Sequence, residues 1–184
     1  MKIMTLAQGR PASAEGRLPR EMRVYDFLDS LGIPYARVDH DPAENMEVCR
    51  EIDLTLGSVI CKNLFLCNRK KTKLFLLMMP GDKVFKTKEL TGQLGEGRLS
   101  FADPSEMLRC LDTEPGAVSV MGLMNDREGA VSLLVDEDVL KGETIGCHPC
   151  VNTSSLRMKT SDIFGVFLPA TGHAMRTVRL TGKD

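Results

Sequence analysis

Residues 58–73 read SVICKNLFLCNRKKTK, and the chain continues through residue 79 as LFLLMM. Apolar residues dominate both runs, and the polar stretch 68–71 between them is typical of a turn that joins two adjacent strands. The pattern predicts a buried β-hairpin with a basic tip. Lys62 stands where the pattern requires a core residue, and a charged group there must be paired, lie at the mouth of a cavity or take part in chemistry. It is a candidate functional residue, and a structural lysine that extends its ammonium to solvent is the alternative.

The bulk composition is that of an ordinary globular domain. The chain has 184 residues, of which 42% are hydrophobic and 27% charged, and this suits one domain with its own core. No apolar run approaches the roughly 18 residues needed to span a bilayer, and the N-terminus lacks the apolar segment of a secretory signal. We therefore expect no membrane association and a cytoplasmic location. The net charge of −1 argues against coating nucleic acid by charge alone, but it allows a local basic patch that binds one end of an RNA.

Element signals along the chain predict a single α+β domain. Residues 1–17 are rich in Gly, Ala, Ser and Arg without periodicity and are expected to form a mobile N-terminal arm, with the domain spanning 18–184. A helix is expected to begin at Pro19 and to end at Gly32. The other predicted helices cover 43–56, 84–94, 104–111, 136–140 and 160–168. Predicted strands outside the hairpin cover 33–38, 98–101, 131–135, 144–151 and 152–158.

The cysteines allow three interpretations. Cys147 and Cys150 form a CxxC pair, which is a spacing used in thiol redox chemistry and in zinc sites. A structural zinc requires a second ligand pair, and the sequence offers no second CxxC and no HxxxH. Free thiols without a metal are therefore the expected state of all six cysteines.

A small set of polar groups can carry chemistry. The sequence has no GxSxG, no Gly-rich phosphate loop and no HExxH, so the candidates are Lys62, Asn63, His148, Asn152 and the loop that begins at Gly116. Pre-aimed N–H groups of such a loop can bind a carbonyl or an oxyanion, and a lysine nearby can hold a phosphate. This combination suits ester hydrolysis by a positioned water. Simpler roles remain open: a turn for Gly116, a strand-end brace for Asn152 and a structural hydrogen bond for His148.

Taken together, these motifs resemble a known family. KNLFL at 62–66, PGD at 80–82, PGAVSVMGLMND at 115–126 and HPxxNT at 148–153 follow one another in the order of the freestanding prolyl-tRNA editing proteins of the YbaK/ProX type. The resemblance covers roughly residues 20–173 and is greatest to the alanyl-tRNA(Pro) deacylase branch. The fold that it implies is a central, mostly antiparallel or mixed, barrel-like β-sheet with surrounding helices.

The resemblance also implies an activity. Such proteins act in trans and hydrolyse the ester that joins a wrong amino acid, here alanine, to tRNA(Pro), without a cofactor, a metal or a covalent intermediate. The alternatives are Cys-tRNA(Pro) or another small amino acid on tRNA(Pro), and a tRNA-binding module without catalysis. The expected partners are the acceptor end of tRNA(Pro) and, as a further candidate, prolyl-tRNA synthetase.

The resemblance also implies a role for each candidate residue. Lys62 matches the lysine needed for activity, near the terminal adenosine and its phosphate, and Asn63 would line the same site. The loop matches the GxxxP element, whose backbone positions the aminoacyl carbonyl and ribose; His148 and Asn152 match the rim of the amino-acid pocket. The loop residues concerned are Gly116, Ala117, Val118, Ser119 and Val120. Val120 departs from the motif, which has proline there, and its N–H and freer φ can change the shape of the loop.

Overall fold

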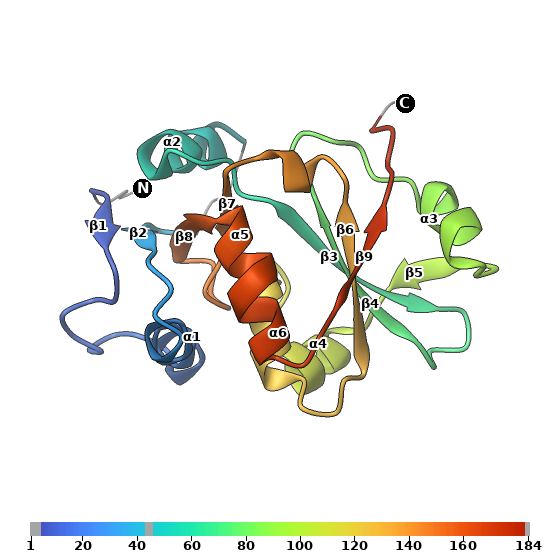
Figure 1. The fold of residues 1–184 in the computed structure, drawn as a ribbon, viewed down its shortest axis with the longest axis horizontal. Helices are drawn as coiled ribbons and strands as arrows, with labels where there is room; N and C mark the ends of the chain where they lie inside the picture. Colours follow the sequence, from blue (N-terminus) through green and yellow to red (C-terminus); the bar gives the residue numbers. More distant parts are fainter. Residues whose placement is uncertain (1–4, 43–45, 183–184) are drawn as a thin grey trace.

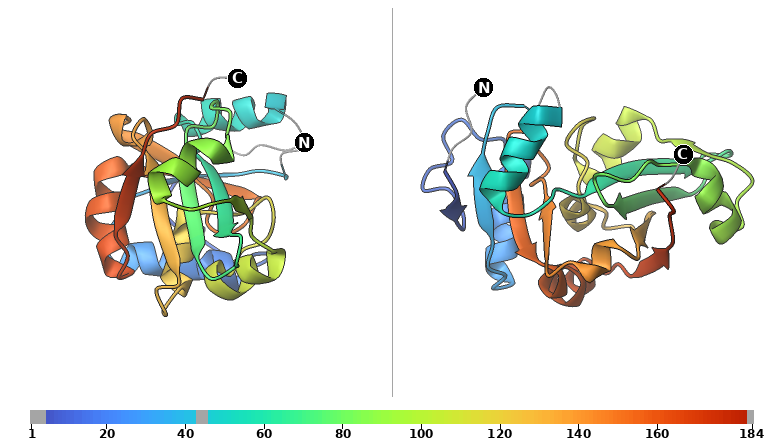
Figure 2. Two further views of the ribbon diagram at one scale, coloured as in Figure 1. Left: turned by 90° about the vertical axis from the view of Figure 1, so that its right-hand side faces the viewer. Right: turned by 90° about the horizontal axis from the view of Figure 1, so that it is seen from above.

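The computed structural model of the chain describes residues 5–42 and 46–182. Its strands form two sheets, one in the order β1-β2-β8-β7 and one in the order β5-β3-β4-β6-β9, which lie on opposite sides of the molecule (Figure 1, Figure 2). The first sheet consists of β1 (Ala7–Gln8), β2 (Ala36–Asp39), β8 (Ser154–Lys159) and β7 (Thr144–Cys147). The second consists of β5 (Leu99–Phe101), β3 (Lys62–Asn68), β4 (Leu74–Met79), β6 (Val131–Asp136) and β9 (Met175–Val178).

Helices cover the outer faces and the junction of the two sheets. Helix α2 packs on β2 and β8, whereas α3 lies beside β5 at the far end of the second sheet (Figure 1). The bounds are α1 Pro19–Ser30, α2 Met46–Leu56, α3 Thr87–Leu94 and α4 Pro104–Leu111, followed by the 3-10 helices η1 Val120–Asn125 and η2 Val139–Lys141. The last helical run joins α5 Thr160–Asp162, a π-helical turn at Ile163–Phe167 and α6 Leu168–Ala170. The chain is thus an α+β protein, as predicted.

The β3–β4 hairpin confirms the prediction from residues 58–79. The two strands pair antiparallel, from Lys62 opposite Met79 to Cys67 opposite Leu74. The side chain of Asn68 closes the turn, because its Oδ1 accepts hydrogen bonds from the backbone N–H groups of Thr72 and Lys73. The hairpin sits in the middle of its sheet, since β5 pairs with β3 and β6 pairs in parallel with β4.

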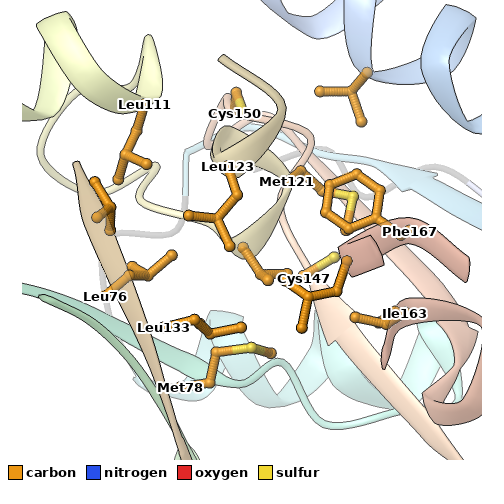
Figure 3. Packing of buried hydrophobic residues seen from close by; sticks show 14 of the residues in the cluster. Leu76, Met78, Leu111, Met121, Leu123, Leu133, Cys147, Cys150, Ile163 and Phe167 are labelled. Atoms are coloured by element: carbon orange, nitrogen blue, oxygen red, sulfur yellow. The ribbon is translucent and has the colours of Figure 1, made fainter. Parts of the chain in front are cut away.

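Both faces of this hairpin are buried, which explains its nearly continuous apolar sequence. Side chains alternate along a strand. One set faces a cluster with Leu90 of α3, and its members in the hairpin are Leu64, Leu66, Phe75, Leu77 and Met79. The other set, Phe65, Cys67, Leu74, Leu76 and Met78, belongs to the main core, part of which Figure 3 shows around Leu123, Leu133 and Phe167. The same alternation places Lys62 and Asn63 on opposite faces of the sheet.

The two sheets meet at one short contact between backbones. Ile60 forms a parallel bridge with Gly146 of β7; the Cys61 N–H donates to the Gly146 O at 2.9 Å, and the Gly146 N–H donates to the Val59 O at 3.2 Å. A Cβ at position 146 would lie 2.8 Å from the Val59 O, so only glycine allows this approach. Among the described strands the sheets stay separate and open, and the barrel-like closure that the family resemblance implied does not form.

The element boundaries differ from the predictions at several places. Strands β1 and β9 and the 3-10 helix η1 were not predicted, and the helix expected at 84–94 begins only at Thr87. The extended run expected over 144–158 is interrupted between β7 and β8, so Asn152 lies in a turn and not in a strand. The predicted start of the second helix at Ala43 lies outside the described residues.

The described part of the expected N-terminal arm, residues 5–17, contacts the rest of the chain. Strand β1 pairs antiparallel with β2, and the guanidinium of Arg17 forms ion pairs with Glu21 and, at 2.7 Å, with Asp39. Arg10 forms a more exposed ion pair with Asp26 at 2.8 Å. In the part of the chain that the structure describes, no helix has the length and apolar character that a membrane span requires.

Candidate active site

The loop before η1 and the turn between β7 and β8 meet at Gly116 and Asn152. Gly116 has a φ of +87°, a conformation that favours glycine because a side chain would be strained there. A Cβ at this position would lie 3.8 Å from the side-chain nitrogen of Asn152. The structure therefore brings together two segments that the sequence analysis assigned to one site, although 36 residues separate them in the sequence.

Only some of the loop's backbone donors are available to a ligand. The Ala117 N–H donates to the Glu114 O at 2.9 Å and is therefore already used. The N–H groups of Gly116 and Val118 donate to no other described residue, and both residues are at least partly exposed. These two donors are the ones that can bind a carbonyl oxygen or an oxyanion.

Ser119 and Val120 form the buried end of the loop. Both are fully buried. The Ser119 hydroxyl accepts a hydrogen bond from the Met121 N–H at 3.2 Å, which caps η1. In this conformation Ser119 and Val120 position the loop and are not exposed to a ligand.

Val120 occupies a position that suits proline. It is the first residue of η1, and the N–H at the start of a helix has no intrahelical acceptor. We expect Val120→Pro to fold and to change the free energy of unfolding by at most about 1 kcal/mol, as measured by chemical denaturation. The matched control is Met121→Pro, which removes the N–H that donates to Ser119 and should be far more destabilising. Equal destabilisation by the two substitutions would contradict this view of the loop.

His148 presents one unprotonated ring nitrogen. Its Nδ1 lies 3.0 Å from the Ser154 O, and since a carbonyl only accepts, Nδ1 carries the proton. The neutral ring then has a free lone pair on Nε2, which hydrogen-bonds to no other described residue. Burial lowers the pKa of His148 below its ordinary value of 6.5, and the nearby His40 lowers this pKa further. At neutral pH Nε2 can therefore accept a hydrogen bond from an amino group, a hydroxyl or a water.

His40 is the residue of this region that the sequence analysis missed. Its ring lies 6.3 Å from that of His148, and its Nε2 lies 2.9 Å from the hydroxyl of Ser155, which is 3.5 Å from Nδ1 of His148. The signal that was present is a histidine two residues after the strand predicted at 33–38, and only the pairing of β2 with β8 brings it beside His148.

The histidine pair predicts a pH dependence of stability. Burial lowers the pKa of His40 as well as that of His148, so the native protein binds these protons more weakly than the unfolded chain. Their contribution to the free energy of unfolding is constant above pH 6.5 and becomes unfavourable as the pH falls below 6.5. We expect the Tm to drop between about pH 7 and pH 5, and to drop less in a His40→Gln/His148→Gln variant. If the Tm falls equally with pH in both proteins, His40 and His148 are not the cause of the pH dependence.

The side chains of Lys62 and Asn63 lie on opposite faces of β3. The Lys62 ammonium donates to the Lys83 O at 2.8 Å and lies on the face covered by α3. The Asn63 amide nitrogen donates to the Cys61 O at 3.0 Å, and its Oδ1 is a buried acceptor that has no hydrogen-bond partner among the described residues. Such an acceptor is costly unless a ligand or water uses it. The structure thus does not bring Lys62 into the Gly116–Asn152 region.

The buried thiols are poorly suited to redox chemistry. Cys147 and Cys150 are both buried, and all six cysteines are free. Burial raises the pKa of Cys150 to about 12 and also raises that of Cys147, so neither forms the thiolate that attacks a disulfide at neutral pH. The CxxC spacing here reflects core packing.

The fold is that of an aminoacyl-tRNA editing domain. The chain belongs to that family, whose model matches residues 40–165 and so includes Lys62, the Gly116 loop and the β7–β8 turn. The comparison confirms the resemblance inferred from the four sequence motifs.

Individual relatives have narrower names. The chain is 29% identical to the prolyl-tRNA editing protein ProX of Acetoanaerobium sticklandii over 83% of this chain and 93% of that protein. It is 33% identical to the prolyl-tRNA synthetase associated domain-containing protein 1 of Xenopus laevis over 86% of this chain and 94% of the relative. A solved structure of a candidate trans-editing enzyme for prolyl tRNA synthetase superposes with a TM-score of 0.66 and 18% identity, covering 89% of this chain and 98% of that one. The last likeness shows the shared fold.

Proposed function

We propose that the protein is a trans-editing deacylase that hydrolyses the ester of mischarged tRNA(Pro), with alanine as the amino acid removed. The observation that supports this most is the family match across residues 40–165, which spans the loop and the turn that meet at Gly116 and Asn152. The relative named for prolyl-tRNA editing, ProX, is covered over 93% of its length, which supports the same substrate class for this chain.

Each candidate residue has a role in this proposal. The free N–H groups of Gly116 and Val118 bind the ester carbonyl oxygen, on which negative charge develops when water attacks. Nε2 of His148 and the amide of Asn152 accept or donate hydrogen bonds at the rim and orient the amino acid. Lys62 acts on the polynucleotide, where its ammonium holds a phosphate near the terminal nucleotide. Hydrolysis then needs water and the terminal ribose hydroxyl, but no covalent intermediate.

The decisive experiment compares three substrates. Purified protein is incubated with Ala-tRNA(Pro), Cys-tRNA(Pro) and Pro-tRNA(Pro), and loss of the aminoacyl ester is followed for each. We expect cleavage of Ala-tRNA(Pro) with Pro-tRNA(Pro) spared. A pocket separates side chains that differ by one methylene by only about 1–3 kcal/mol, so the comparison with cysteine measures how the site ranks small amino acids.

The remaining outcomes identify the alternatives. Preferential loss of cysteine would make the protein a Cys-tRNA(Pro) deacylase. Saturable tRNA binding without cleavage of any of the three esters would make it a binding module. Under our proposal the reaction takes place in the cytoplasm, where charged tRNA is used, and prolyl-tRNA synthetase, which supplies the mischarged substrate, is the candidate protein partner.

A further inference from the structure

A groove of about 650 Å³ lies at the α3 end of the five-stranded sheet, away from the Gly116–Asn152 region. It is lined by the start of β3, the edge strand β5 and the first turn of α3. Helix α3 and strand β5 lie at the right of Figure 1. Its lining residues combine apolar and basic side chains: Lys62, Leu64, Phe85, Lys86, Thr87, Lys88 and Phe101. None of these residues except Lys62 and Leu64 belongs to a motif used above.

The floor of the groove is aromatic and exposed. Phe101 lies on the three-residue edge strand β5 and is 62% exposed, which is unusual for so large an apolar side chain. Its ring packs edge-to-face against that of Phe85, with centroids 6.4 Å apart. The neighbouring contact holds the Phe101 ring in place while leaving much of its surface open to a flat partner.

The rim of the groove is positively charged. Lys86 and Lys88 are exposed, and neither these two nor Lys62 forms an ion pair with another described residue. Among the described residues, the Lys62 ammonium hydrogen-bonds only to the neutral carbonyl of Lys83, so its charge is not neutralised. The N-terminus of α3 at Lys86–Thr87 adds the positive end of a helix dipole. Aromatic rings framed by such charges are complementary to bases and phosphates together.

We propose that this groove binds unpaired nucleotides of an RNA end, with a base stacked on Phe101 and Phe85 and the adjoining phosphates held by Lys86, Lys88 and Lys62. The inference rests on the proposed function. If the aminoacyl ester at the 3′ end of the RNA is bound at the active site, the nucleotides before it must cross the protein surface. Stacking on phenylalanine tolerates any base, so the groove recognises single-stranded character and not sequence.

The test measures binding of uncharged RNA to the full-length protein by fluorescence anisotropy. The probes are a labelled RNA hairpin with a short unpaired 3′ extension and the same hairpin with a blunt end. We expect the extended hairpin to bind more tightly, and Phe101→Ala to weaken its binding about fivefold or more with little effect on the blunt one. Phe101→Tyr keeps the ring and should retain the binding. Lys86→Ala and Lys88→Ala should each reduce the salt dependence by about 0.7 in the slope of log Kd against log salt.

The matched control is Leu108→Ala, which removes a side chain that is 50% exposed on α4, outside the groove. Equal affinity for the two hairpins, or an unchanged affinity of Phe101→Ala for the extended hairpin, would overturn the proposal. Dimerisation that depends on Phe101, without an effect on RNA binding, would also overturn it and would assign the groove to a second copy. Because the RNA is not aminoacylated, binding that depends on both the extension and Phe101 would stand even if no ester were cleaved, and in that case only the deacylase proposal fails.

Discussion

Lys62→Ala is expected to lower kcat/KM for hydrolysis of mischarged tRNA(Pro) by about 100-fold or more. The ammonium at this position holds a phosphate of the terminal nucleotide in our proposal, and a small misplacement of the ester relative to its binding groups costs a rate factor of this size. The fold should survive, because the side chain is only partly buried and loses a single hydrogen bond, to the Lys83 O. That loss should cost about 0.5–1.5 kcal/mol in the free energy of unfolding.

Two further variants make the Lys62 experiment specific. Lys70→Ala removes the same charge from the exposed tip of the β3–β4 hairpin and should leave the rate nearly unchanged. Lys62→Met keeps most of the aliphatic stem and removes only the ammonium, so it should be as inactive as Lys62→Ala. An unchanged rate in Lys62→Ala would end the role assigned to this lysine, whatever the substrate proves to be.

Lys83→Met should lower the free energy of unfolding by about 3–5 kcal/mol, since it leaves a buried carboxylate without its cation. The Lys83 ammonium is 2.9 Å from both carboxylate oxygens of Asp136, whose side chain is fully buried, and 2.7 Å from the carboxylate of Asp138. It also donates to the Leu180 O at 2.7 Å. Burial opposes the charged form of Lys83, yet hydrogen bonds to Asp138 and Asp136 outweigh it and raise the pKa of the amine.

A loss of this size corresponds to a fall in Tm of roughly 6–20 °C for a domain of this length. The control is Lys86→Met, an exposed lysine outside the ion-pair network, which should shift stability by no more than about 0.5 kcal/mol. Thermal unfolding of the three proteins side by side measures the difference. If Lys83→Met has the same Tm as the wild type, the ion pair with Asp136 does not stabilise the native state. Because the Lys83 carbonyl holds Lys62, the same variant also reports on how that lysine is positioned.

The central hairpin could be predicted from the sequence because two apolar runs and a polar turn are local signals. Helices α1 and α4 could be predicted for the same reason, since each begins with proline and carries a helical stripe. Strand β9 could not, because Met175–Val178 is short and largely exposed and becomes a strand only by pairing with β6. The separation into two sheets depends on long-range pairing and on the close approach at Gly146, which no local pattern encodes.

Only part of the site could be predicted from the sequence, because its residues are also brought together by long-range pairing. Gly116 and Asn152 were assigned to one site by resemblance, and the structure places them close together. Lys62 and Asn63 are adjacent in the sequence and were expected to serve one pocket, but neighbouring residues of a strand face opposite ways. His40 carried no motif of its own, and its relevance follows from the pairing of β2 with β8. The catalytic role of Lys62 and the substrate-binding roles stay predictions.

The lengths of the outermost strands have a consequence for behaviour in concentrated solution. The open sheets end on β1 and β7 in one case and on β5 and β9 in the other, and these strands have only two to four residues. An edge of this length offers too few unpaired N–H and C=O groups to template the addition of a strand from a neighbouring molecule. The long apolar strands β3, β4 and β6, which would aggregate if exposed, are enclosed on both sides. The fold thereby keeps its most aggregation-prone sequence away from the sheet edges, which are formed by short strands.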